Sequence, residues 1–499
     1  MTTFTHEFDT PVFKKKVSFP TGIFINNEFS AGVNNTTIDL VNPTTGQVVA
    51  QVSEGMPADV DRAVAAARKA FETTWGLNTP GFDRGRLLTR LADLMEENMD
   101  ELAALDAFDN GKSFMMARHG DVPFSISVIR YFAGWADKNH GQTIETTEAK
   151  FAYTRHEPVG VCGQIIPWNF PLLMMVSKIG PALATGCTVV LKPSEVTPLT
   201  ALRMAQLIVA AGFPPGVVNI VVGYGSTVGQ AIAEHLGIDK VSFTGSTVVG
   251  RKILEASAKS NLKKVTLELG GKSPSIVFDD ADLDQAVKWV ALGIFGNAGQ
   301  ACVAGSRIFI QEGIYDKFLE AFTKHATSIK LGDPFRADSQ QGPQVSQIQY
   351  DRVMGYINSG KEQGAKVHTG GSRHGNLGYW IQPTIFTDVR PDMKIVREEI
   401  FGPVGVVIKF KDEDDVVRQA NDTLYGLAAA VFTKDIKRAV ETANRVQAGT
   451  VWVNSMMSGN VQIPFGGYKQ SGIGRENGEA ALAEYTNVKA VHVNLGHTL

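Results

Sequence analysis

One of the three cysteines has neighbours that suit a nucleophile. Cys302 follows the small-residue run 296–301 (GNAGQA) and precedes 303–305 (VAG). Small side chains on both sides leave room for a substrate to reach the sulfur, whose thiolate form attacks carbonyl carbons. Cys162 and Cys187 lie in or beside apolar strand-like runs, and we expect them to be small buried hydrophobic residues. Three scattered cysteines exclude a disulfide scaffold and are typical of a reducing compartment.

Two further polar residues stand alone in segments that are otherwise apolar or rigid. Glu268 is the single carboxylate of residues 265–271 (VTLELGG), and burial would raise its pKa and suit it to act as a general base. The alternative is an ion pair with a distant Arg or Lys. Asn169 lies in the strand-to-helix turn 165–171 (IIPWNFP), where its amide would either stabilise an oxyanion or cap a helix.

Two short segments are compatible with a bound dinucleotide. Residues 243–250 (FTGSTVVG) are typical of a strand, a glycine turn and a helix start, where backbone N–H groups and the Ser246 hydroxyl suit a pyrophosphate. Neither this segment nor the glycine run 223–229 matches the Gly-x-Gly-x-x-Gly fingerprint. Lys192 and Glu195, at another strand end, suit ribose hydroxyls, or else are a surface Lys and a helix-start Glu.

Several other functions are disfavoured by spacing and charge. The ten His and three Cys show no metal-ligand spacing, so we expect no metal site. The segments 111–113 and 271–273 end like a P-loop but lack its upstream glycine, and no Gly-x-Ser-x-Gly elbow occurs. A net charge of −3 and the lack of an apolar run of about 18 residues indicate neither a nucleic acid nor a membrane partner. The N-terminus lacks a signal-like apolar run, which favours the cytoplasm.

The elements that must position these residues follow an alternating pattern in 158–270. Apolar strand-like runs at 160–166, 188–191, 217–222, 240–244 and 263–269 alternate with helical patterns at 172–184, 198–211, 227–235 and 246–259. Such alternation predicts a doubly wound parallel sheet, with ligands bound at the carboxyl ends of its strands.

The rest of the 499 residues predicts a second α/β domain and smaller parts. Strands are expected at 275–278, 307–310, 404–409 and 451–453, strands and loops in 1–56, and helices at 58–75 and 83–105. Segment 141–158 and the tail with Val488, Val491 and Val493 have strand composition that neither core needs. Because an unpaired strand edge is a liability, we expect both segments to pair with another chain in a homo-oligomer.

Five motifs together resemble the signatures of the NAD(P)-dependent aldehyde dehydrogenase superfamily, and the resemblance covers nearly the whole chain. They are 167–171 (PWNFP), 267–274 (LELGGKSP), 295–302 (FGNAGQAC), 398–403 (EEIFGP) and 464–467 (PFGG). The resemblance implies two doubly wound parallel-sheet domains plus a small β oligomerisation extension. The implied ranges are 1–135 and 159–270 for NAD binding, 271–470 for catalysis, and 136–158 and 471–499 for the extension.

The resemblance also implies a reaction and its catalytic residues. Cys302 attacks the aldehyde, Asn169 and the Cys302 backbone N–H stabilise the oxyanion, hydride passes to the nicotinamide, and Glu268 activates water to release the acid. NAD is the expected cofactor, with NADP disfavoured because Glu195 would repel a 2′-phosphate. The implied cofactor residues are Ile165, Ile166, Pro167, Trp168, Lys192, Glu195, Gly225, Gly229, Phe243, Thr244, Gly245, Ser246, Val249, Leu269, Gly270, Gln349, Glu399 and Phe401.

Substrate choice is expected to depend on a tunnel to Cys302. Acetaldehyde-preferring members of the family often have bulky aromatics where this chain has small residues at Ser177, Gly296 and Gly459. Its candidate walls are Met174, Met457 and Phe465. We therefore expect medium or bulky aldehydes to be tolerated.

Three rival functions stay open on sequence grounds. Acyl transfer to coenzyme A on the same scaffold typically lacks the deacylating glutamate, whereas Glu268 is present. A structural protein on this fold would not need Cys302, Glu268 and Asn169 together. A thiol hydrolase would need a nearby His, and none lies close to Cys302 in the sequence.

Overall fold

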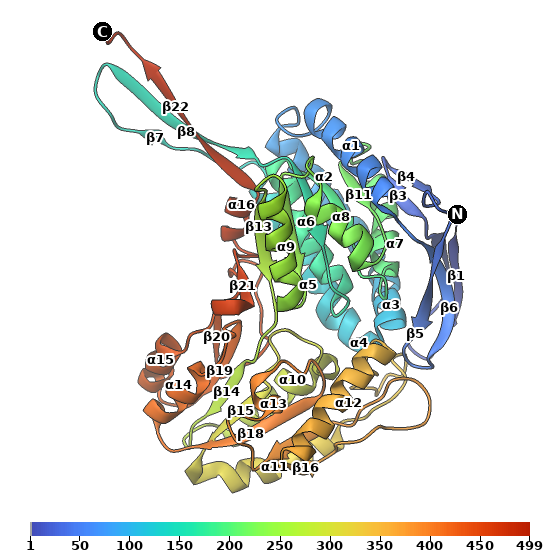
Figure 1. Ribbon diagram of the computed structural model, residues 1–499, viewed down its shortest axis with the longest axis vertical. Coiled ribbons are helices and arrows are strands. Elements are labelled where there is room, and N and C mark those ends of the chain that lie inside the picture. Colours follow the sequence, from blue (N-terminus) through green and yellow to red (C-terminus); the bar gives the residue numbers. More distant parts are fainter. Residues whose placement is uncertain (1) are drawn as a thin grey trace.

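The computed structural model describes residues 2–499, and its two largest elements are β-sheets that helices cover on both faces (Figure 1). The first sheet has eight strands, and its five central ones are parallel. Its spatial order is β21 (Gly472–Ile473), β13 (Lys264–Glu268), β12 (Lys240–Thr244), β9 (Val161–Ile165), β10 (Thr188–Lys192), β11 (Val218–Ile220), β3 (Ile23–Ile25) and β4 (Glu28–Ser30). The expected doubly wound parallel sheet is confirmed.

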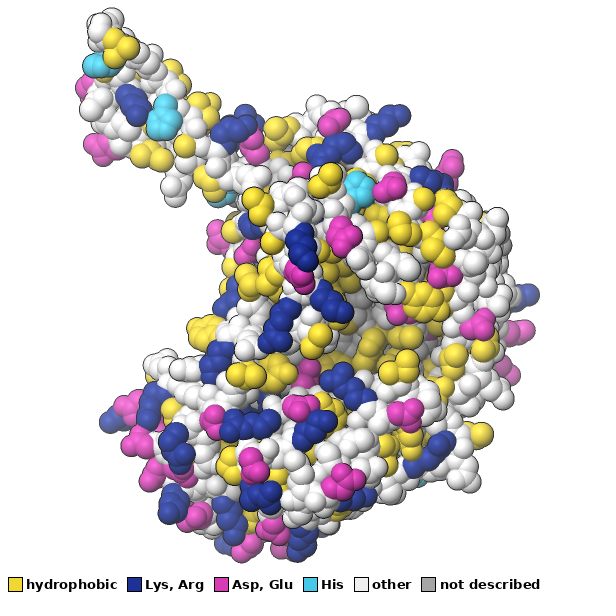
Figure 2. All heavy atoms as spheres, viewed as in Figure 1, with side chains coloured by type: hydrophobic (Ala, Val, Ile, Leu, Met, Phe, Trp, Pro, Cys, Tyr) yellow, Lys and Arg dark blue, Asp and Glu magenta, His cyan; other side chains and the backbone are white. Residues whose placement is uncertain are grey.

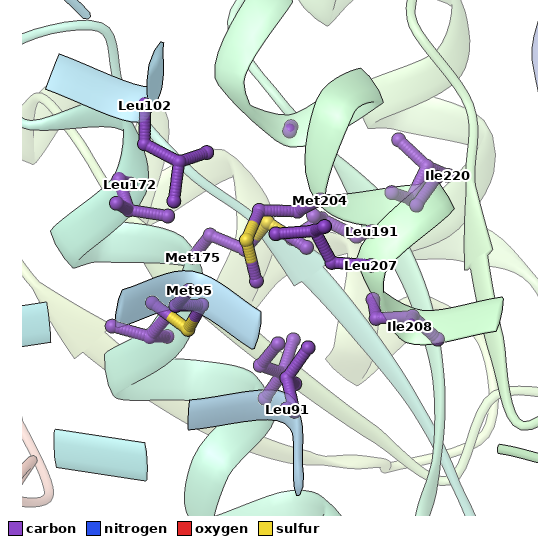
Figure 3. Packing of buried hydrophobic residues seen from close by; sticks show 14 of the residues in the cluster. Leu91, Met95, Leu102, Leu172, Met175, Leu191, Met204, Leu207, Ile208 and Ile220 are labelled. Atoms are coloured by element: carbon purple, nitrogen blue, oxygen red, sulfur yellow. The ribbon is translucent and has the colours of Figure 1, made fainter. Parts of the chain in front are cut away.

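Crossover helices between the central strands build the core of this domain. They are α6 (Pro171–Thr185), α7 (Leu199–Ala211), α8 (Gln230–Glu234), which a π-helical turn at Gly225–Gly229 precedes, and α9 (Thr247–Lys259). Figure 3 shows leucines, isoleucines and methionines of α6, α7 and the strands packed against side chains of α2 and α3. The strands are apolar on both faces because helices cover both, which is why their sequences show continuous apolar runs.

The helices before the first sheet differ from the expectation in one place. The helix expected at 58–75 is α1 (Pro57–Thr73). The single helix expected at 83–105 is wrong, because the chain forms α2 (Gly81–Glu97) and α3 (Met99–Asn110). Asn98 leaves the helical conformation (φ −110°, ψ 19°), and its amide nitrogen donates to the Leu94 carbonyl at 2.8 Å. A side-chain bond to the preceding turn competes with the continued helix and ends it.

The second sheet has seven strands, six of them parallel. Its order is β16 (Lys366–Thr369), β17 (Thr384–Thr387), β18 (Val404–Phe410), β15 (Arg307–Gln311), β14 (Pro274–Val277), β19 (Ala428–Phe432) and β20 (Thr450–Val453). Its helices are α10 (Leu283–Phe295), α11 (Tyr315–Ser328), α12 (Gln347–Glu362), α13 (Lys394–Arg397), α14 (Glu413–Asn421) and α15 (Ile436–Arg445). Four of these strands were expected, and β16, β17 and β19 were not.

An extended arm leaves the body of the molecule (Figure 1). It consists of β7 (Thr143–Ile144), β8 (Lys150–Pro158) and β22 (Thr486–Asn494), and β8 pairs antiparallel with both others. The two segments expected to pair with another chain therefore pair with each other. Within the described chain, the outer edge of β22 has no strand beside it, so pairing with a second chain stays a prediction.

The remaining elements surround the first sheet. Two hairpins, β1 (Thr3–Asp9) with β2 (Lys14–Pro20) and β5 (Thr37–Asn42) with β6 (Gln47–Ser53), lie at its edge (Figure 1). The short helices α4 (Phe114–Met116) and α16 (Ala480–Glu484) and the longer α5 (Val122–Trp135) complete the chain. Because β21 pairs with β13 and α16 lies near α6, part of the segment 471–499 belongs spatially to the first sheet. Across residues 2–499, no helix is both long and apolar enough to span a bilayer.

Candidate active site

The candidate catalytic and cofactor-binding residues lie where the two sheets meet. Figure 2 shows this face hollowed between the two sheets, with hydrophobic side chains inside and Lys and Arg side chains along the rim. From the first sheet, Lys192, Thr244 and Glu268 are the last residues of β10, β12 and β13. The chain then crosses to β14 through residues 269–273, and a side chain on Gly271 would lie 2.3 Å from the Cys302 carbonyl oxygen. The crossing segment therefore touches the loop that carries the cysteine.

The loop before Cys302 has a strained backbone. After α10 ends at Phe295, three consecutive residues, Asn297, Ala298 and Gly299, have positive φ angles of 50°, 55° and 72°. Left-handed conformations are costly for residues other than glycine and persist only when the surroundings enforce them. At Gly299 a side chain would lie 2.0 Å from the Gly402 carbonyl oxygen. The loop is thus clamped against the segment that precedes β18.

Asn169 belongs to the hydrogen-bond network that holds this loop. Its side-chain nitrogen donates to the Gln300 carbonyl at 3.2 Å, and the Asn297 amide donates to the Asn169 and Gln300 carbonyls at 3.0 and 3.2 Å. Phe170, not Asn169, precedes α6 as the capping residue, so the helix-cap alternative is wrong. Nδ2 of Asn169 carries two hydrogens, and only one is used in this bond. The amide is therefore fixed beside the cysteine loop with a second N–H to donate.

The Cys302 thiol is half-buried among apolar walls and two carboxylates. Burial, followed by the negative charges of Glu399 and Glu268, raises its pKa to about 12, while the backbone N–H groups of Val303 and Cys302 lower it. The thiol is therefore protonated at neutral pH in this state of the protein. Cys162 and Cys187 are fully buried in the first sheet, as expected.

Glu268 is 5% exposed, and its Oε2 atom has no hydrogen-bond partner. Burial and the nearby Glu476 carboxylate raise its pKa well above the usual range, while the Lys178 ammonium opposes the shift. Lys178 is itself fully buried and forms an ion pair with Glu476. Gly466 leaves space here, since a side chain would lie 2.8 Å from Glu268 Oε1. The sequence alternative was an ion pair between Glu268 and a distant Arg or Lys. In the structure, the nearby lysine, Lys178, pairs with Glu476 and not with Glu268.

The residues expected to bind the adenosine end of the cofactor lie close to one another. Lys192 is buried, and its ammonium donates to Glu195 Oε2 and to the Pro193 carbonyl, both at 3.0 Å. A side chain on Gly229 would lie 3.7 Å from the Lys192 Cδ atom, and Gly225 has open space. The Lys192 and Glu195 side chains are therefore paired beside two glycines that keep their surroundings open.

The start of α9 offers what a phosphate group needs. Ser246 caps the helix by accepting a hydrogen bond from the Val249 N–H at 3.4 Å. The Thr244 hydroxyl is buried without a partner, which is costly unless a ligand supplies one. Gly245 brings its backbone close to the Phe243 ring, which a side chain would contact at 2.5 Å. A free hydroxyl, a helix N-terminus and small residues together fit a dinucleotide phosphate.

Glu399 lies against the crossing segment 269–273. The Gly271 N–H donates to its Oε1 at 3.0 Å, and a side chain on Gly270 would lie 2.4 Å from its Oε2. Burial raises the pKa of Glu399 to about 7, against the Gly271 hydrogen bond and the positive charges of Arg352 and Lys272. The carboxylate is therefore held in one place beside Cys302.

Phe401 has a positive φ of 59°, which is unusual for an aromatic residue. Gln349 on α12 donates to the Phe401 carbonyl at 2.7 Å, and the Trp168 ring meets the Phe401 ring edge to face at 5.2 Å. These contacts hold the Phe401 ring in place beside Trp168. The remaining expected cofactor residues lie at the same junction of the sheets: Ile165, Ile166 and Pro167 follow or end β9, and Leu269 follows β13.

Some of the residues expected to line the substrate tunnel pack near Cys302. Met174, Met457 and Phe465 pack on the same apolar cluster as Cys302. A side chain on Gly296 would lie 3.9 Å from the Met457 sulfur, and Ser177 is one helical turn from Met174 on α6. A side chain on Gly459 would meet the Phe124 ring at 3.5 Å.

Sequence reasoning missed Lys178, Glu476 and Phe124. A signal existed for Lys178, which is the only cation of the apolar helix α6. Glu476 and Phe124 lie in segments without a recognisable pattern, and α5, which carries Phe124, was itself unexpected. In the described chain, no group of three or more His, Cys, Asp and Glu side chains is arranged to hold a metal ion.

Comparisons with known proteins all point to one enzyme family. The model of the aldehyde dehydrogenase family matches residues 29–491. An aldehyde dehydrogenase of Agaricus bisporus is 67% identical over 492 residues, covering 99% of this chain and 98% of the relative. An NAD+ complex of an aldehyde dehydrogenase from Bacillus cereus is 50% identical, has a TM-score of 0.95 and covers 96% of this chain and 97% of its own. A betaine aldehyde dehydrogenase from Staphylococcus aureus in complex with NAD+ is 42% identical, with a TM-score of 0.94 and coverage of 96% and 95%.

Proposed function

The chain belongs to the aldehyde dehydrogenase family and is an oxidoreductase that acts on aldehydes, and from this premise we propose that it oxidises an aldehyde to a carboxylic acid through a covalent bond to Cys302. The observation that carries the proposal is the position of the Cys302 thiol. It is half-buried between two carboxylates and on a loop that Asn169 helps to hold. A planar carbonyl does not release hydride readily, whereas addition of sulfur makes its carbon tetrahedral and electron-rich.

The first step is addition of the Cys302 sulfur to the aldehyde carbon. The half-exposed Cys302 thiol loses its proton to solvent water, a C–S bond forms as the C=O π bond breaks, and the oxygen takes on the negative charge. The free N–H of Asn169 and the backbone N–H of Cys302 stabilise that charge. One such donor contributes about 3 kcal/mol in comparable sites. NAD, when bound, supplies the hydride acceptor that turns the adduct into a thioester on Cys302.

The second step is hydrolysis of that thioester, with Glu268 as the base. Ionised Glu268 takes a proton from water, the water oxygen bonds to the acyl carbon, and the C–S bond breaks to release the acid. The Cys302 sulfur leaves as a thiolate, and the proton taken up by Glu268 restores the thiol. The raised pKa of Glu268 makes it a stronger proton acceptor than an exposed glutamate once it is ionised.

The same residues favour NAD over NADP. Glu195 stays close to Lys192 at 3.0 Å, so the ammonium is already neutralised, and a 2′-phosphate would meet a carboxylate. The NAD+ complexes of the Bacillus cereus and Staphylococcus aureus enzymes support a nicotinamide cofactor at this site. Thr244, Ser246 and Val249 would hold its phosphates, with Glu399 and Phe401 at the nicotinamide end.

The substrate we propose is an aldehyde larger than acetaldehyde. Gly296, Gly459 and Ser177 leave space between Met174, Met457 and Phe465, and Phe124 adds a further aromatic wall. The extended arm and the free edge of β22 support a homo-oligomer. The domain division at residues 135, 158 and 270, with β21 and α16 assigned to the first sheet and not to the extension, is also proposed. A cytoplasmic location, which three unpaired cysteines favour, completes the proposal.

The test is NADH formation across a panel of aldehydes of increasing size, with identification of the product. We expect free acid as the product, activity that persists for medium and aromatic aldehydes, and none in Cys302→Ser. The matched control is Cys162→Ser, a thiol buried in the first sheet, which should keep its activity. Acyl-coenzyme A as the product, or full activity in Cys302→Ser, would contradict the proposal, and kcat/KM that falls steadily beyond two carbons would contradict the substrate class.

A further inference from the structure

A small cavity with two cations lies at the start of the second sheet. Lys272, Ser273 and Arg307 line it, together with Thr423 and Tyr425, and its volume is about 10 Å³. Lys272 and Arg307 are only 1% and 2% exposed. A cavity of this size has room for one water molecule or one monatomic ion.

Both cations lack a negative partner. The Lys272 ammonium is buried without any hydrogen bond, and the Arg307 guanidinium donates only to the carbonyls of Lys272, Gln419 and Ala420, at 2.7 to 3.1 Å. Neither forms an ion pair within residues 2–499, and carboxylates such as Glu399 and Asp422 act on them only through longer-range attraction. Two adjacent buried charges of one sign are strongly unfavourable unless something compensates them.

The residues that line the cavity indicate which species could balance the two positive charges. The Ser273 hydroxyl is also buried without a partner, and no carboxylate lines the cavity. A metal cation is excluded by the two positive charges, and the small volume favours a monatomic anion over sulfate, phosphate or a carboxylate. Water would fill the space but would compensate neither the Arg307 guanidinium nor Lys272 in its protonated form. We propose that Lys272, Ser273 and Arg307 form a binding site for a small monovalent anion, of which chloride is the simplest.

Burial and the neighbouring Arg307 lower the pKa of Lys272 to about 7. An anion favours the protonated ammonium, so its binding must become tighter as the pH falls through this value and weaker as it rises. This pH dependence distinguishes anion binding at the site from a general effect of salt. General screening acts on exposed charges and does not depend on the protonation of one lysine.

The direct test uses bromide as a chloride probe with anomalous scattering. Crystals of the full chain grown in sodium bromide should show an anomalous peak within contact of Lys272 Nζ, and crystals of Lys272→Met should not. Sodium chloride should also raise the Tm of the protein saturably, whereas sodium gluconate at equal ionic strength should not, because gluconate is too large. This difference should grow below about pH 7.

Three results would overturn the proposal. They are a water molecule with no anomalous signal in the cavity, an equal Tm in both salts, and a bromide peak without a saturable shift, which would indicate an adventitious ion only. If Lys272→Met does not fold, Ser273→Ala provides the second variant. Its half-saturating chloride concentration should rise several-fold, and an unchanged value would contradict the assignment.

Discussion

The two sheets supply their site residues from opposite ends of their parallel strands. In the first sheet, Lys192, Thr244 and Glu268 are the last residues of their strands. In the second sheet, Cys302 lies in the loop that precedes β15, and Glu399 lies in the loop that precedes β18. Ligands of open α/β sheets bind at the carboxyl ends of the strands, so only the first sheet follows the general rule.

This difference shows how one site is divided between two domains. The chain passes directly from Glu268 at the end of β13 to Pro274 at the start of β14, which sets the carboxyl end of one sheet against the amino end of the other. In the first sheet, the site residues belong to strands, so the backbone hydrogen bonds of the sheet fix their positions. The loops of the second sheet rely on left-handed backbone and side-chain hydrogen bonds, as at Asn297 and Gln300.

The two carboxylates beside Cys302 provide the sharpest test of this comparison. Glu268, on the first sheet, is expected to activate water, so Glu268→Gln should lower the steady-state rate by about 10²–10⁴-fold while leaving one rapid turnover of NADH. Glu399→Gln, on the second sheet, should mainly raise the KM for NAD, because Glu399 is assigned to cofactor binding. Stopped-flow and steady-state kinetics of both variants separate the roles, and a burst in Glu399→Gln but not in Glu268→Gln would reverse them.

Asn169 connects the first sheet to the loop of the second, and its removal should act on the first step. We expect Asn169→Ala to lower kcat/KM by about 10²–10³-fold, as for loss of one oxyanion donor. The size of the burst should then fall together with the steady-state rate, because adduct formation becomes limiting. A variant with normal kcat/KM would assign Asn169 to loop structure alone, and its Tm would identify that role.

The pH dependence should reflect the raised pKa values of Cys302 and Glu268. Burial and nearby carboxylates disfavour the charged forms of both groups. Raised pKa values mean that the active ionised forms become more abundant as the pH rises, so kcat/KM should climb with pH through the neutral and alkaline range. In Glu476→Gln the negative charge beside Glu268 is lost, and the climb should begin at lower pH. A profile that is flat, or unchanged in this variant, would contradict the electrostatic account.

Cofactor choice should give the smallest of these effects, because Glu195 is partly exposed. Glu195→Gln removes the carboxylate that would repel a 2′-phosphate and frees the Lys192 ammonium for it. We expect the ratio of kcat/KM for NADP to that for NAD to rise by about tenfold. Glu234→Gln, on the neighbouring helix α8, is the matched surface control. An unchanged ratio would show that Glu195 does not select the cofactor.

The comparison also explains what the sequence could predict. The first sheet has continuous apolar strands separated by helical patterns, so its five central strands, with Glu268 as the last residue of β13, were confirmed by the structure. In the second sheet β19 is largely alanine (AAAVF), which carries little strand signal. The cluster of Lys178, Glu476 and Glu268 joins residues far apart in the chain, and no local pattern reports such a contact.

The central claim is that one sulfur carries the acyl group, and mass spectrometry of trapped enzyme tests it directly. Glu268→Gln is mixed with NAD and an aldehyde, quenched in acid and digested, and the three cysteine peptides are examined. The account predicts an acyl group on Cys302 alone, with Cys162 and Cys187 unmodified. Unmodified Cys302 during a measured burst of NADH, or an acyl group on another cysteine, would contradict it.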